Sequence, residues 1–288
     1  MRLSYDTKLS MGALVHSASE EPLWADEISG IVDVDRHPLY SSTSGAARWR
    51  AEAHRRFRTT GVCLFDDFLR AEALDALRNE LDTVVDDAYV STTYSSVYLE
   101  PGDASFPAGH PRREEHVTRV GTLAEDQLAP DSLLHRIHAS AVFRQFVGDI
   151  VGAGRLYGYA DGLTSVNVLV FKEGHRLGWH FDESNYAVTL LLGPASAGGA
   201  FEYAPNIRTP GDENYAAIQR VLTGPGEGSV VAPLRAGSLM IFRGRRSLHR
   251  VAAVGAGRPR LVAVLSYDTR PGVCLSEHDR RLFFGRIA

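Results

Sequence analysis

The arrangement of apolar and polar residues changes part-way along the chain. Between Gly61 and about Gly154, apolar side chains recur at helical spacing, which is typical of amphipathic helices. After Gly154 they occur in short β-branched or aromatic runs that Gly, Pro and Asn separate, which is typical of strands joined by turns. The pattern therefore predicts helices first and a β-rich body afterwards.

Two amphipathic helices are predicted in the first part. One follows a short buried strand, GVCLFDDF, and covers AEALDALRNELDTVVDDA. A second helical region begins near Asp131, and within it Ser140 is placed to cap a helix that ends at Gly152. Both helices have one apolar face, so we expect them to pack against the rest of the fold.

The second part predicts roughly eight or nine strands within about 115 residues. Such closely spaced strands with almost no helix favour an antiparallel barrel or a double-sheet jelly roll. One exception is DENYAAIQRVL from Asp212, which predicts a short inserted helix. The expected fold class is α+β, mainly β, with flanking helices before the barrel.

We expect one domain over residues 1–288. Its parts are an N-terminal extension (1–60), a helical flank (61–153), a β-rich core (154–270) and a C-terminal tail (271–288). Residues 103–116 and 210–228 are candidate lids, because long loops with Gly and Pro hinges often carry function.

The composition is that of a globular protein with a substantial core. The 288 residues are 44% hydrophobic and 23% charged, which excludes disordered and small disulfide-stapled classes. Lys occurs only at Lys8 and Lys172, so 29 of the 31 basic residues are Arg. They are scattered, as a coding bias would leave them, and the net charge of −4 gives no reason to expect nucleic-acid binding.

The sequence predicts a cytoplasmic protein. MRLSYDTKLSMGALVH lacks the apolar stretch of a secretory signal, and no run of about 18 apolar residues could span a membrane. Cys63 and Cys274 have no CxxC or zinc-site spacing, so we expect free thiols in a reducing compartment.

A candidate metal site lies in the strand GWHFDES. His180 and Asp182 are two residues apart, so their side chains leave the same face of a strand. His249, at the start of a later strand, could supply a third ligand. Two imidazoles and one carboxylate on one face leave positions open, as non-haem Fe(II) oxygenases require. An HxD pair alone also occurs by chance.

An arginine provides a second clue. Arg260 opens the apolar strand RLVAVLSYD, and an inward guanidinium there could bind a dicarboxylate. A salt bridge at the strand end is the structural alternative, and Arg258 is a rival for the same role.

Taken together, these segments resemble the Fe(II)/2-oxoglutarate-dependent oxygenase superfamily over about residues 155–270. The matching stretches are HFD at 180–182, GGAFEY from Gly198, PLRAGSLMIF from Pro233, HRV from His249 and RPRLVAVLSY from Arg258. The resemblance implies a double-stranded β-helix, also called a jelly roll. It also implies Fe(II) on His180, Asp182 and His249, with 2-oxoglutarate bound through Arg260 and with O₂ as oxidant.

HFDESNYAVTLLL and GGAFEYAPNIR are similar to enzymes that hydroxylate or halogenate free amino acids. In the related halogenases a small residue replaces the carboxylate ligand, whereas this chain retains Asp182. The resemblance therefore implies hydroxylation of an unactivated C–H bond in a small polar substrate, a free amino acid or derivative of specialised metabolism. Desaturation or cyclisation of another metabolite remains an alternative.

Several polar residues are candidate contacts around this centre. Glu183 could receive an ammonium group, and Asn206 and Arg208 could meet a carboxylate, although all three also fit exposed strand ends or loops. His175 could touch substrate or simply occupy a hairpin turn. Asn167, polar within SVNVLVF, either lines the cofactor site or bonds to neighbouring backbone.

Two other functions compete with the oxygenase. Cupin-like metal enzymes usually carry HxH followed by Glu and His, which HFD does not match. A binding barrel without catalysis would lack a ligand or the anion-binding arginine, and this chain offers both.

Overall fold

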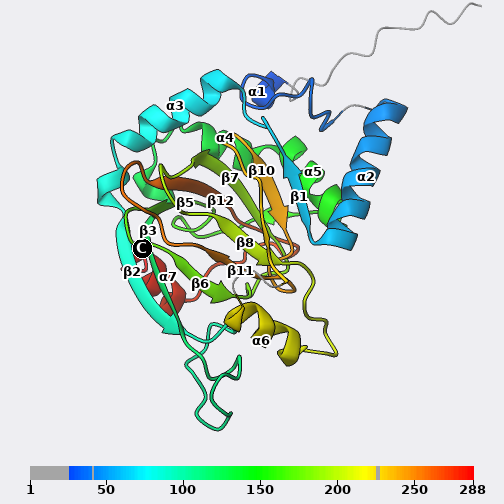
Figure 1. Cartoon of the computed structure of the whole chain (residues 1–288). Helices are drawn as coiled ribbons and strands as arrows, with labels where there is room; N and C mark the ends of the chain where they lie inside the picture. Colours follow the sequence, from blue (N-terminus) through cyan, green and yellow to red (C-terminus); the bar gives the residue numbers. More distant parts are fainter. Residues whose placement is uncertain (1–25, 41, 225–227) are drawn as a thin grey trace, which may run out of the picture.

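The fold is described from a computed structural model over residues 26–40, 42–224 and 228–288. Two antiparallel sheets lie face to face, and helices cover the outer face of the larger one (Figure 1). This is the predicted jelly roll, with an α+β, mainly β, composition. No helix in the described ranges is long and apolar enough to cross a membrane.

The larger sheet has seven strands and the smaller one four. In spatial order the larger sheet contains β1 (Val62–Phe65), β10 (Leu239–Phe242), β7 (Ala187–Gly193), β12 (Arg260–Leu265), β5 (Val166–Phe171), β3 (His116–Leu123) and β2 (Tyr89–Ser95). The smaller sheet contains β6 (Leu177–His180), β11 (Leu248–Val251), β8 (Phe201–Ala204) and β9 (Val230–Val231). β4 (Tyr157–Gly158) pairs with β13 (Tyr267–Asp268) at one side.

Seven α-helices lie in the described ranges, and local sequence signals fix the ends of some of them. They are α1 (Asp26–Ser29), α2 (Ser44–Thr60), α3 (Ala71–Asp82), α4 (Leu133–Ala139), α5 (Ala141–Val151), α6 (Tyr215–Thr223) and α7 (Glu277–Phe284), with 3₁₀ turns η1 (Val85–Asp87) and η2 (Glu125–Gln127). The predicted cap of α5 is confirmed, because the Phe143 N–H donates to Ser140 Oγ at 3.3 Å. Gly152 ends that helix with a φ of 71°.

Successive side chains of a strand point to opposite faces of the sheet and so contribute to two different cores. In β12, Leu261, Ala263 and Leu265 contribute to the core beneath the helices, whereas Val262 belongs to the core between the two sheets. Arg260 shares the parity of Val262 and therefore also faces the smaller sheet. A polar side chain on this face of a strand, such as that of Arg260, therefore points into the space between the two sheets.

The structure adds elements to three parts of the predicted organisation. The helical flank (61–153) also supplies β1, β2 and β3 to the larger sheet. The extension (1–60) contains α2, and the tail (271–288) contains α7. Residues 1–25 of the extension lie outside the described ranges. The helix α2 escaped prediction because its buried residues are only Ala46, Ala53 and Phe57 among many charged ones.

Candidate metal centre and substrate cavity

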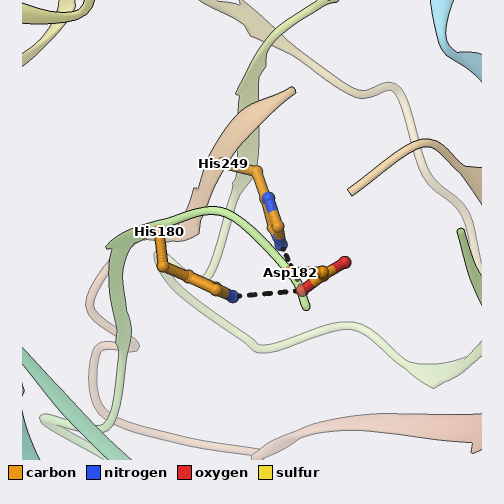
Figure 2. Close-up of side chains that lie close together, drawn as sticks. All are labelled: His180, Asp182 and His249. Atoms are coloured by element: carbon orange, nitrogen blue, oxygen red, sulfur yellow. Dashed lines mark ion pairs between the residues drawn. The ribbon is translucent and has the colours of Figure 1, made fainter. Parts of the chain in front are cut away.

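The three predicted ligands meet at the smaller sheet. His180 ends β6 and His249 lies in β11, where the two residues are direct antiparallel partners. Asp182 Oδ1 lies 3.5 Å from His180 Nε2 and 3.3 Å from His249 Nε2 (Figure 2). One ligand atom from each residue falls within 4.8 Å of the other two. The strand register therefore brings together residues that are far apart in sequence.

Backbone carbonyls fix the orientation of both imidazoles. His180 Nδ1 lies 2.8 Å from the Gly178 carbonyl oxygen, and His249 Nδ1 lies 3.0 Å from that of Ser247. A carbonyl oxygen only accepts, so each Nδ1 carries the hydrogen and each Nε2 presents a lone pair. This outer support is typical of histidines that bind metals.

The charge balance at the centre suits a cation. Burial raises the pKa of Asp182, but His249 and His180 outweigh this effect and hold its pKa well below the usual range. Burial and the nearby His180 lower the pKa of His249. A carboxylate oxygen thus lies within 3.5 Å of the Nε2 atoms of both imidazoles. The donor set fits a divalent metal ion.

Arg260 is a buried cation without an acidic partner among the described residues. Its side chain is 5% exposed, and no ion pair or side-chain hydrogen bond joins it to another described residue. Burial lowers its pKa to about 10, so it remains charged at neutral pH. The rival Arg258 is exposed. An unpaired buried guanidinium calls for an anion from outside the chain, and Arg260 is the better placed of the two.

A cavity of about 330 Å³ opens beside Asp182. Its lining contains two predicted substrate contacts, Glu183 and Arg208, together with the metal-site residue Asp182. The remaining lining residues are Tyr98, Glu100, Arg112, Phe181, Glu213 and Arg245. The cavity is strongly polar and carries both signs of charge, so it suits a small zwitterionic or polar molecule better than an apolar one.

Comparison with known proteins places the chain in a family. The Halogenase D family model matches residues 46–278, most of the chain. The chain belongs to the Halogenase D family. It is an Fe(II)/2-oxoglutarate-dependent oxygenase, with Fe(II), 2-oxoglutarate and O₂ as its cofactor and cosubstrates. No curated protein matches it.

Solved structures with the same fold are distant in sequence. The non-heme alpha ketoglutarate dependent epimerase SnoN from nogalamycin biosynthesis is 18% identical, with a TM-score of 0.54 over 77% of this chain and 81% of its own. AviO1 from Streptomyces viridochromogenes Tue57 is 18% identical, with a TM-score of 0.52 over 79% and 97%. The carbocyclase SnoK from nogalamycin biosynthesis is 18% identical, with a TM-score of 0.51 over 80% and 89%.

Two of the three arginines that line the oxygenase cavity, Arg112 and Arg208, differ in how they are paired. Arg208 Nη1 lies 3.1 Å from Glu213 Oε2, and its Nε donates to the Arg245 carbonyl at 2.8 Å. Arg112 Nε donates to the Tyr215 hydroxyl at 2.8 Å, but its ion pair with Glu100 is long, at 3.9 Å. The charge of Arg208 is therefore already paired with that of Glu213, whereas the charge of Arg112 is more available to a ligand.

Three other predicted contacts lie outside the lining of this cavity. Asn206 Nδ2 donates to the Thr59 carbonyl at 3.1 Å, at the end of α2. His175 is buried in the hairpin between β5 and β6, with Nδ1 3.3 Å from the Val170 carbonyl oxygen. Asn167 lies in β5 on the strand parity of Phe171, which packs in the inter-sheet core, and its Nδ2 donates to the Thr164 carbonyl at 3.4 Å.

The two candidate lids contact each other near the cavity. Gln219 Nε2 of α6 donates to the Gly109 carbonyl at 3.0 Å, and the His110 ring lies 4.6 Å from that of Tyr215. In Figure 1 the long loop that precedes β3 lies beside α6. Sequence reasoning named both segments but missed Arg112 and Glu213, whose only signal was their place in charged loops.

Proposed function

We propose that the chain hydroxylates an unactivated C–H bond of a free amino acid or a close derivative. In this proposal His180, Asp182 and His249 hold Fe(II), and Arg260 pairs with the distal carboxylate of 2-oxoglutarate. The bound iron supplies the oxidising chemistry: one atom of O₂ enters the C–H bond, and the other enters succinate as CO₂ leaves. The main support is the convergence of two imidazole lone pairs on the Asp182 carboxylate.

The retained carboxylate favours hydroxylation over halogenation. Asp182 occupies the ligand position that a small residue leaves open for chloride in the related halogenases. Its Oδ1 faces both imidazoles at 3.5 Å or less. The chain therefore has a hydroxylase-type donor set within a family named for a halogenase.

The charged cavity supports a zwitterionic substrate. We propose that Arg112 receives its carboxylate and Glu183 its ammonium group, while Arg208 fixes Glu213 at the wall. Arg112 replaces Arg208 as the expected carboxylate partner because the charge of Arg208 is already paired. The residues exclude water and orient the C–H bond beside Asp182.

The decisive experiment measures succinate and oxidised product together. A panel of amino acids and derivatives is incubated with Fe(II), 2-oxoglutarate, chloride and isotopically labelled O₂. We expect an alcohol that carries the label, formed together with succinate, and no turnover in His180→Ala or His249→Ala. A chlorinated product would overturn the role given to Asp182, and loss of two hydrogens without label would favour desaturation. Failure across the panel would redirect the search to other small metabolites.

We also propose that the enzyme works in the cytoplasm. Cys63 is buried and Cys274 is exposed, and both are free thiols, as a reducing compartment allows.

A further inference from the structure

Gly244 lies directly against the carboxylate of Asp182. A Cβ atom added at Gly244 would stand 1.6 Å from Asp182 Oδ2 and 2.4 Å from its Cγ. These separations are far below any non-bonded contact, so no side chain can share this space with the carboxylate as placed. Figure 2 shows one Asp182 oxygen directed at the imidazoles and the other directed away from them.

Backbone conformation does not explain this glycine. Gly244 is not among the residues with a positive φ, so its φ does not itself require glycine. Gly237 offers a contrast nearby in sequence, with a φ of 82° and its nearest Cβ neighbour at 3.5 Å. The requirement at Gly244 is therefore for space rather than for conformational freedom.

The turn that contains Gly244 also holds the backbone around the ligand. The Asp182 N–H donates to the Gly244 carbonyl at 3.2 Å, and Arg245 Nε donates to the Glu183 carbonyl at 2.8 Å. The Ser247 carbonyl, at the end of the same turn, orients His249. The turn itself is tied to the larger sheet by the hydrogen bond from Arg243 N–H to the Gly61 carbonyl, at 2.7 Å.

We propose that Gly244 is a positioning residue for the metal centre. It reserves the volume that Oδ2 occupies, and its carbonyl anchors the Asp182 backbone, so that Oδ1 faces the two imidazoles. Asp182 Oδ2 is buried and has no hydrogen-bond partner among the described residues, so packing against Gly244 takes the place of a polar restraint. The inference rests on the proposed function only in taking Asp182 as a ligand.

The test is a double-mutant cycle read by Co(II) absorption in the purified full chain. Gly244→Ala should weaken Co(II) binding by about tenfold or more, the usual cost of disturbing the support of a ligand. Gly162→Ala is the matched control, because its Cβ would meet nothing within 4 Å and its φ is not positive. In an Asp182→Gly background, Gly244→Ala should change Co(II) affinity by less than about twofold, since additivity fails only for contacting sites.

Each outcome bears on one of the two proposals. If the wild-type chain binds no Co(II), the proposed function fails. If it binds and Gly244→Ala binds equally well, or loses affinity equally in the Asp182→Gly background, the positioning role is wrong. Should Gly244→Ala fail to fold, folding of the Asp182→Gly, Gly244→Ala double variant would still assign the clash to the carboxylate. Failure of that double variant to fold would overturn the inference.

Discussion

At the scale of single residues, Arg260 and Asp182 have opposite electrostatic surroundings. Asp182 lies between two imidazoles that hold its pKa down, whereas burial alone lowers the pKa of Arg260. Phe171 lies across the strand pair, with its ring 5.7 Å from the guanidinium carbon of Arg260. Without an anion beside it, the buried arginine should therefore destabilise the fold that carries it.

Replacing Arg260 should increase the stability of the fold and weaken the binding of 2-oxoglutarate. Arg260→Met is expected to raise the free energy of unfolding by about 1 kcal/mol or more, because an unpaired buried charge is removed. The same variant should raise the 2-oxoglutarate requirement on the order of 100-fold, as expected for a lost buried charge pair. Urea unfolding without 2-oxoglutarate and a KM titration measure the two effects. Arg258→Met is the control, and a large cosubstrate defect there would exchange the two assignments.

Arg112 should govern the affinity for substrate rather than for cosubstrate. Arg112→Gln removes the charge that we assign to the substrate carboxylate, so the substrate KM should rise by about tenfold or more. The KM for 2-oxoglutarate should change by less than about twofold, since Arg112 lines the proposed substrate cavity, whose lining does not include Arg260. Steady-state kinetics with the substrate found in the panel check both values. An unchanged substrate KM would return the assignment to Arg208.

At the scale of elements, α5 shows how local signals fix a helix that supports the barrel. Ser140 caps its start and Gly152 ends it, while Phe143, Phe146 and Ile150 are fully buried beneath the larger sheet. A Cβ at Gly152 would lie 2.7 Å from His54 Cε1 of α2, in addition to the strain of a positive φ. The helix is thus fixed both by its ends and by its neighbours.

Two substitutions should show which end of α5 contributes more to the free energy of unfolding. Ser140→Ala is expected to cost about 1 kcal/mol in the free energy of unfolding, because it removes the cap. Gly152→Ala should cost more, since it combines backbone strain with a clash against α2. Urea unfolding checks the order, with exposed Gly162→Ala as the control. Equal losses at both ends would show that the contact with His54 is relieved without cost.

The predictable elements were those with a strong periodic signal. The strands from Val166 onward and α5 carry clear apolar runs, so their places in the chain were predictable. The strand β2 reads YVSTTYS and is half exposed, so it gives no apolar alternation to detect. The HxD pair marked two of the three clustered side chains directly, but the partnership of His180 with His249 depends on strand register. Beyond Glu183 and Arg208, the cavity wall could not be predicted, because loop geometry alone brings Arg112 and Glu213 to it.

At the scale of the whole molecule, buried and half-buried histidines link stability to pH. Burial lowers the pKa of His37, His138 and His175 below the ordinary value of 6.5. Below about pH 6.5 the unfolded chain then binds protons that the folded chain does not. Their contribution to stability is complete above that pH and is lost as the pH falls.

The free energy of unfolding should therefore decrease as the pH falls from 7 to 5.5. His138→Gln should flatten this dependence on pH, because glutamine does not titrate. Glutamine can still donate to the Ser266 carbonyl, which lies 3.0 Å from His138 Nε2, so the variant should keep the fold. His278→Gln, at an exposed position, is the control. Urea unfolding across the pH range measures the slopes, and an identical slope in both variants would contradict the assignment.

The position of all three proposed ligands at one end of the smaller sheet links metal binding to local opening of that sheet. His180 and His249 face each other across β6 and β11, so opening this strand pair separates the donor atoms. A metal ion that binds only the closed form adds about 2.7 kcal/mol to closure at a hundred times its Kd. Amide hydrogen exchange in β6 and β11 should therefore slow markedly with bound Co(II), whereas local exchange in α5 should not. Iron supply would then set the lifetime of the active site as a folded unit, independently of the helical layer behind it.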